Sequence, residues 1–184
     1  MPGFFLKKEN MKTRIFTVVL MCILVLFETG FCQDCGADYK MAVQAAKNKE
    51  MDLSYLYLDS FLTGCPGSRL RDRVLFAAGE YNFETNNFRQ AATNFVELID
   101  NYPDFKGKLF ALVYLYKIAE SAGQHELQEK LKTEIVTFKR VSLLFRNSQK
   151  YVYKSPLLKR HKVEYYIDRV EFYLDGESFA QIPF

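Results

Sequence analysis

Few residues in this 184-residue chain are spaced for catalysis or metal binding. The two histidines, His125 and His161, have no second ligand at the spacing that zinc sites use. Glycine-rich phosphate loops, nucleophile motifs and calcium loops are absent from the sequence. Glu80 and Glu84 are four residues apart, and such pairs on a helix usually lie in solvent. These patterns predict a protein that is not an enzyme and has no metal or cofactor.

The cysteines indicate covalent chemistry of a structural kind. Cys22 lies in an apolar N-terminal stretch and Cys32 lies at its edge, which leaves Cys35 and Cys65 for the mature chain. In an antiparallel helical hairpin the start of the first helix lies beside the end of the second helix, and these two cysteines occupy those positions. We therefore predict a disulfide between Cys35 and Cys65. A redox role for Cys32 and Cys35 is not favoured, because no βαβ pattern surrounds them.

The N-terminal stretch is typical of an export signal. Four basic residues precede an apolar run from Ile15 to Phe27, and small residues follow that run. As a helix the run would reach roughly 20 Å, which is shorter than the ~30 Å hydrocarbon core of a bilayer. We predict a signal peptide over residues 1–32, with Met11 as a possible true start. The chain is then periplasmic or otherwise exported, and a lipoprotein is less expected because Phe31 precedes Cys32.

Composition excludes some classes of protein and leaves others open. Hydrophobic residues make up 49% of the chain and charged residues 26%, which argues against a disordered or polytopic membrane protein. Positive and negative side chains nearly balance once the signal is removed, so the whole chain is not built for an anionic partner.

Basic residues nevertheless gather in one segment that contains no Asp or Glu. Such a segment can bind anionic lipid or cell-wall polymer, whereas nucleic acid is not expected in an exported protein. The alternative is a solvated surface that the acidic residues between Glu164 and Glu177 neutralise. The candidate anion-binding residues are Lys139, Arg140, Arg146, Lys150, Lys154, Lys159, Arg160 and Lys162.

Two segments in the middle of the chain follow the same plan. Each ends at a proline, Pro66 or Pro103, and these prolines are 37 residues apart. Between them, residues 70–85 and 88–99 have apolar residues at helical spacing, and Asn86-Asn87 supplies a turn. The pattern predicts a unit of helix, short turn, helix and stop.

This unit resembles the tetratricopeptide repeat. Pro103 matches its final proline, Gly79 and Ala91 match its small positions, and Phe95 matches its aromatic position. Residues 36–66 and 107–140 resemble it more weakly. The amino-acid sequence of these segments is most similar to exported bacterial proteins of the BamD-like outer-membrane assembly and YbgF-like groups. The alternative fold is a helical bundle unrelated to these repeats.

The resemblance implies an all-α protein of about three stacked hairpins over residues 33–140. The basic segment and a cap then occupy residues 141–184. For this cap, residues 163–174 have a helical stripe, whereas Asp175-Gly176 is typical of a β-hairpin, so a capping helix or a small hairpin is expected.

The resemblance also implies a concave face that binds a protein partner in the bacterial cell envelope. The first helix of each repeat would present the face, with aromatic anchors and both signs of charge. A second interpretation packs Phe76 and Phe83 against the C-terminal segment. The alternative function is docking of residues 139–162 on anionic lipid or cell-wall polymer. The oligomeric state stays open. The candidate partner-binding residues are Tyr39, Val43, Arg73, Phe76, Glu80, Phe83, Phe110, Val113, Lys117 and Glu120.

Overall fold

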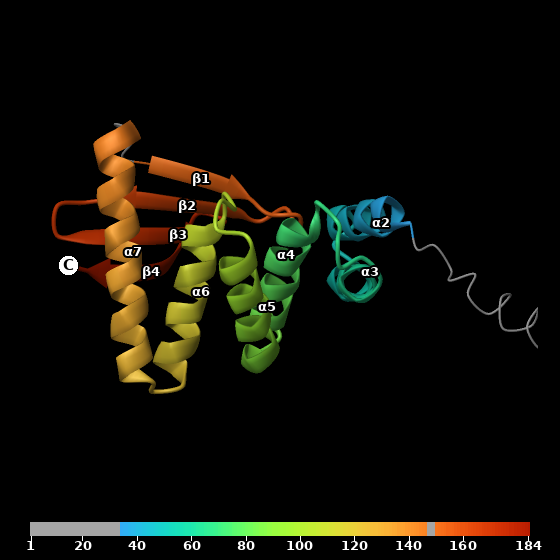
Figure 1. The fold of residues 1–184 in the computed structure, drawn as a ribbon, viewed down its shortest axis with the longest axis horizontal. Helices are drawn as coiled ribbons and strands as arrows, with labels where there is room; N and C mark the ends of the chain where they lie inside the picture. Colours follow the sequence, from blue (N-terminus) through green and yellow to red (C-terminus); the bar gives the residue numbers. More distant parts are fainter. Residues whose placement is uncertain (1–33, 147–149) are drawn as a thin grey trace, which may run out of the picture. The chain divides into compact units, whose positions relative to one another are not determined.

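The computed structural model describes residues 34–146 and 150–184, and the side chains of residues 138–149 are not described. The predicted signal peptide, its cleavage site and the start at Met11 lie outside the described residues. The described chain contains six helices followed by four strands (Figure 1). The helices are α2 (Cys35–Lys47), α3 (Met51–Gly64), α4 (Arg71–Glu84), α5 (Phe88–Asn101), α6 (Lys108–Ser121) and α7 (His125–Arg146).

The helices pair in chain order as three hairpins, α2 with α3, α4 with α5, and α6 with α7. Each hairpin turn contains one residue in the left-handed backbone region: Lys49 (φ 65°), Asn86 (φ 60°) and Gly123 (φ 66°). Glycine and asparagine adopt this region at the lowest cost among the amino acids. The turn predicted at Asn86-Asn87 is therefore confirmed, and Gly123 supplies the corresponding turn of the third hairpin.

Prolines separate one hairpin from the next. Helix α3 ends at Gly64, two residues before Pro66, and α5 ends at Asn101, two residues before Pro103. A proline cannot donate a backbone hydrogen bond and restricts the residue before it, so neither helix continues. The two predicted stops are confirmed.

A glycine allows α4 and α5 to approach closely. A Cβ atom placed on Gly79 would lie 2.6 Å from Cε1 of Phe95, well inside van der Waals contact. Phe95 is itself buried and stacks on Tyr114 with ring centroids 4.9 Å apart. The small residue expected at Gly79 therefore makes room for the aromatic residue expected at Phe95.

The expectation of an all-α protein is wrong. Residues 150–183 form a four-stranded antiparallel sheet in the order β1-β2-β3-β4. A capping helix over residues 163–174 does not form, and the β-hairpin expected at Asp175-Gly176 does, with both turn residues at positive φ (52° and 95°). The strands are β1 (Lys150–Lys154), β2 (Arg160–Tyr165), β3 (Arg169–Leu174) and β4 (Glu177–Pro183).

The helical stripe was misleading because only two of its members, Val163 and Val170, are buried in the sheet, whereas Tyr166 and Ile167 are exposed. Val163, Val170 and Phe172 occupy buried positions on one face of the sheet, and β-branched and aromatic residues favour strands. An isolated hairpin is marginally stable, but β1 and β2 extend this one to four strands.

One face of the sheet packs on the helices and shares their core. Phe76 of α4 meets Tyr153 of β1 edge to face, with ring centroids 5.1 Å apart. Phe110 of α6 meets Phe172 of β3 at 6.2 Å, again edge to face. The first helices of the second and third hairpins therefore contact the chain's own sheet.

The segment between β1 and β2 extends the sheet's contacts to the first hairpin. Leu157 is buried in a second core cluster with Ala42 of α2, Leu58 and Phe61 of α3, and Val74 of α4. Hydrogen bonds from Ser155 N to Lys159 O (3.0 Å) and from Leu158 N to Ser155 O (2.9 Å) close the turn that presents this leucine. The sheet therefore contacts all three hairpins through named side chains.

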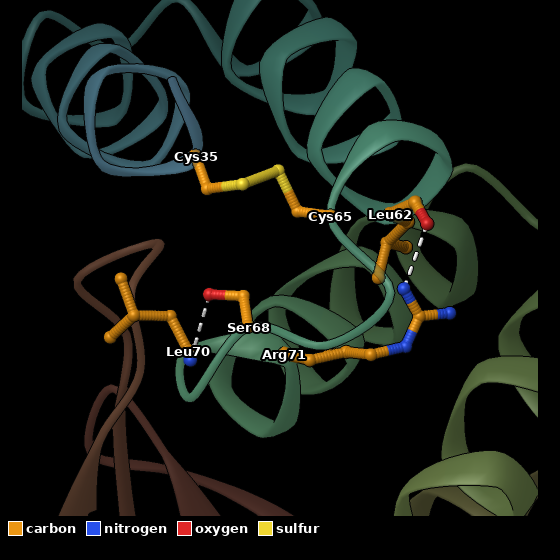
Figure 2. The surroundings of a disulfide bond; sticks show 6 residues. All are labelled: Cys35, Leu62, Cys65, Ser68, Leu70 and Arg71. Carbon is orange, nitrogen blue, oxygen red and sulfur yellow. Dashed lines mark hydrogen bonds between the residues drawn. A yellow bond between two sulfur atoms is a disulfide. The ribbon is translucent and has the colours of Figure 1, made fainter. Parts of the chain in front are cut away.

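The predicted disulfide between Cys35 and Cys65 is present (Figure 2). It joins the start of α2 to the residue that follows α3, and the two Cα atoms are 5.9 Å apart. The same connection is anchored to the next hairpin by Arg71, which donates to the Leu62 carbonyl (2.7 Å) and pairs with Glu97 of α5 (2.8 Å). The disulfide closes the first hairpin at the ends opposite its turn.

We expect removal of this disulfide to lower the free energy of unfolding by roughly 3 to 4 kcal/mol, because it closes a loop of about 30 residues in the unfolded chain. The measurement is urea unfolding of the Cys35→Ala, Cys65→Ala double variant beside the oxidised protein. Reductant should lower the stability of the parent protein by a similar amount and leave the variant unchanged. Equal stability of parent and variant under oxidising conditions would contradict the prediction.

Candidate partner-binding groove

Several residues predicted to contact a partner are covered by the sheet. Phe76, Glu80 and Phe110, on the first helices of the second and third hairpins, are buried, and so is Val113. The prediction that they line an open groove therefore needs correction, because the C-terminal sheet occupies the face from which they project. The second interpretation, with Phe76 and Phe83 packed on the C-terminal segment, matches the observed contacts.

Glu80 meets a polar partner inside this core. Its Oε1 lies 2.5 Å from Nε2 of His161 on β2, and the two side chains are 0% and 2% exposed. Rings of Phe76, Phe110 and Tyr114 surround the histidine, with centroids 5.1 to 5.9 Å from its own. Burial, followed by the charge of Glu80, raises the pKa of the Tyr114 hydroxyl well above its ordinary value. The pair joins a helix to the sheet and is closed to solvent.

The remaining predicted residues of α4 and α6 lie toward the other ends of these helices. Phe83 is half-buried between Tyr114 and Phe179 of β4, with ring centroids 5.0 and 5.8 Å away. Lys117 and Glu120 pair with each other at 2.5 Å on an exposed turn of α6. These three residues are not part of the groove described next.

A groove of about 800 Å³ lies where the first hairpin, the start of α4, the α5–α6 connection and the end of β1 meet. Tyr39 and Val43 of α2 and Arg73 of α4 line it, as the repeat register predicts for a ligand-facing surface. Lys154 of β1, which was predicted as an anion-binding residue of the basic segment, lines the same groove. The structure therefore brings together members of the two predicted sites.

The groove carries both signs of charge. Arg73, Lys106 and Lys154 supply positive charge, Asp72 and Asp104 supply negative charge, and none of the five forms an ion pair with another described residue. Unpaired charges of both signs beside apolar walls suit a polypeptide, which offers amide, charged and apolar groups together.

The electrostatic surroundings of Tyr153 indicate that several groove residues are close to one another. Burial raises the pKa of its hydroxyl far above the ordinary value, and the nearby Glu80, Tyr39 and Asp72 raise it further. Arg73 opposes them and lowers the pKa. Tyr153 therefore stays neutral, as a hydrogen-bonding group at the inner wall of the groove.

Ser155 lies at the end of β1 and also lines the groove. It is 3% exposed, and its hydroxyl has no hydrogen-bond partner among the described residues. A buried hydroxyl without a partner costs free energy that a hydrogen bond from a ligand would recover. In the sequence, its position directly before Pro156 is the one signal that marks this serine.

Most of the described basic residues predicted to bind anions have carboxylate partners. Lys150 and Lys162 pair with Glu164 at 3.1 and 3.2 Å, and Lys159 pairs with Glu84 of α4. Hydrogen bonds from Lys150, Lys162 and Tyr166 lower the pKa of Glu164 to about 2. The alternative interpretation of a surface neutralised by nearby acids therefore accounts for these three lysines.

The other basic residues are placed as follows. Arg160 is exposed, and its backbone N–H donates to Asp175 (2.8 Å). Lys139, Arg140 and Arg146 belong to α7, and their side chains lie outside the described residues.

Metal and membrane chemistry gain no support from the described part of the chain. No three His, Cys, Asp or Glu side chains in residues 34–137 and 150–184 are placed to hold a metal ion. Among the helices that the structure describes, none is long and apolar enough to cross a bilayer. The chain matches no family model and no curated protein.

Proposed function

We propose that this chain is an exported scaffold of tetratricopeptide-like hairpins that binds another polypeptide of the bacterial cell envelope without turnover. The groove that joins Tyr39, Arg73 and Lys154 is the observation that carries the proposal. Its volume of about 800 Å³ lies within the range of specific ligand sites. Its lining includes tyrosines and an arginine, which are among the types that contribute most to binding energy at interfaces.

The disulfide supports the exported location. Disulfide bonds such as Cys35–Cys65 persist in oxidising compartments such as the periplasm and are rare in the cytosol. The predicted signal over residues 1–32 agrees with this location.

Photo-crosslinking from the groove tests the proposal. A benzoylphenylalanine in place of Tyr39, which lines the groove, is expected to form a discrete adduct with one envelope protein in living cells. The matched control places the same group at Thr93, an exposed position on α5. Adducts of the same identity and yield from both positions, or none from Tyr39, would overturn the proposal.

Docking on anionic lipid or cell-wall polymer is less favoured. Lys150, Lys159 and Lys162 already have carboxylate partners, which lowers the charge that they present to a polyanion. Sedimentation with anionic vesicles at low and high salt tests this alternative: binding to the vesicles that disappears as salt screens the charges would favour it.

A further inference from the structure

The outer edge of β1 has hydrogen-bonding groups without a neighbouring strand. β1 stands at one margin of the sheet, with β2 as its sole partner strand in the described residues. The backbone hydrogen bond from Ser155 N to Lys159 O shows that these two opposite residues are a hydrogen-bonded pair. In antiparallel strands, hydrogen-bonded and non-hydrogen-bonded residue pairs alternate along the ladder. Tyr151 and Tyr153 therefore bond to β2, whereas the N–H and C=O of Val152 and Lys154 point to the outer edge.

The side chains of β1 differ sharply between its two faces. Tyr151 and Tyr153 point toward the helices, and Phe110 lies beside both rings. Lys150, Val152 and Lys154 lie on the solvent face, where Val152 is 46% exposed. This face presents an apolar side chain between two lysines: Lys150 shares the Glu164 carboxylate of β2 with Lys162, whereas Lys154 forms no ion pair with a described residue.

The edge runs directly into the groove. Tyr153 and Lys154 are both strand residues of β1 and lining residues of the groove, and the buried hydroxyl of Ser155 follows them. A chain laid along β1 would therefore end beside the groove that Arg73 also lines.

We infer that an acidic, extended segment of a partner polypeptide adds to the β1 edge as a fifth strand. Alternate residues of an added strand share one face, so a segment of the pattern acid-x-apolar-x-acid sets its carboxylates beside Lys150 and Lys154. Its apolar residue covers Val152. Main-chain bonds supply affinity and these side chains supply selectivity. The inference rests on the proposed function and names the chemistry of the partner segment.

Charge disfavours one symmetric pairing of the edge with a second copy of this chain. Symmetric antiparallel pairing of two β1 strands about Val152 would place Lys150 of one copy opposite Lys154 of the other. Like charges directly opposite one another destabilise a strand pair, whereas an acidic strand is attracted.

The opposite margin of the sheet is a poorer acceptor. The bond from Phe184 N to Asp168 O sets the ladder between β3 and β4, so the backbone of Gln181 and Pro183 points to the outer edge of β4. Pro183 has no N–H to donate there, and proline at this position blocks strand addition.

Fluorescent peptides of nine residues provide the probe. One has the sequence Thr-Thr-Glu-Thr-Val-Thr-Glu-Thr-Thr, a second has lysine for both glutamates, and a third moves one glutamate by a single residue to the other face. Anisotropy titration of the full, disulfide-bonded chain should give the first peptide about tenfold tighter binding than either of the others, because two opposite-charge pairs form only there.

Variants of the edge complete the test. Val152→Pro removes an outward N–H without touching the ladder to β2, so binding of the first peptide should be lost. Gln181→Pro makes the same change on the β4 edge and should leave binding unaltered. Lys150→Glu combined with Lys154→Glu should exchange the preference, so that the lysine peptide binds tighter.

Three results would overturn the inference. They are full binding by a folded Val152→Pro protein, an unchanged preference in the charge-exchanged variant, and no binding of the first peptide up to about 1 mM. If Val152→Pro fails to fold by circular dichroism, the charge exchange decides. If the crosslinked adduct at position 39 still forms in the Val152→Pro protein, strand addition is rejected and the proposed function is kept. If no adduct forms even without the Val152→Pro change, the proposed function itself is rejected.

Discussion

Replacing His161 by alanine is expected to lower the free energy of unfolding by about 3 to 5 kcal/mol, because it leaves the Glu80 carboxylate buried without its partner. Glu80 and His161 are 0% and 2% exposed, and Glu80 Oε2 already has no hydrogen-bond partner in the described residues. The rings of Phe76 and Phe110 beside the pair offer no hydrogen-bond donor. Urea unfolding followed by circular dichroism measures the change.

Two control variants separate this effect from a general sensitivity to mutation. Lys117→Ala breaks the exposed pair with Glu120 and should cost less than about 1 kcal/mol. Glu80→Met combined with His161→Phe removes both polar side chains while keeping volume, and should recover most of the stability that the single change loses. A loss of less than about 1 kcal/mol in His161→Ala would contradict the burial of a charged carboxylate at Glu80.

Replacing Phe76 by alanine is expected to cost about 3 to 5 kcal/mol of stability, because the ring is fully buried between α4 and the sheet. The ring contacts Phe95, Phe105 and Tyr153 with centroids 5.1 to 5.8 Å away, so a cavity would open at the centre of the shared core. Thermal and urea unfolding measure the loss. Any loss of partner binding in this variant then follows from loss of the fold.

Arg73→Ala is the matched control on the same helix, one turn earlier. Arg73 is exposed and lines the groove, so its removal should change stability by less than about 0.5 kcal/mol while weakening a partner held there. Phe76→Ala with unchanged stability and lost binding would contradict the buried position of this ring.

Local patterns predicted the helical part of the fold well. The apolar stripe of residues 88–99, the turn at Asn86-Asn87 and the stops at Pro66 and Pro103 are set by backbone preferences of neighbouring residues. The disulfide followed from the same information, since Cys35 and Cys65 flank one hairpin. Such features depend on residues close in sequence, and for this reason they could be predicted without the tertiary structure.

The groove could be predicted only in fragments. Tyr39 and Arg73 followed from a repeat register, and Lys154 followed from a run of basic residues. Nothing local indicated that β1 returns to the start of α4 and places these side chains around one groove. Ser155 was missed because its burial depends on elements more than fifty residues away in the chain.

By itself the sequence determined the helices over residues 70–85 and 88–99, the turn between them, the proline stops and which cysteines join. Tertiary structure alone decided that residues 150–183 are strands, because Val163 and Val170 suit a helical stripe and a buried strand face equally. Tertiary structure also decided which face of the hairpins the sheet covers and which face stays exposed to solvent. Glu80 and His161 are 81 residues apart, and the free energy of burying rings between helix and sheet brings them together and leaves the β1 edge and its groove exposed.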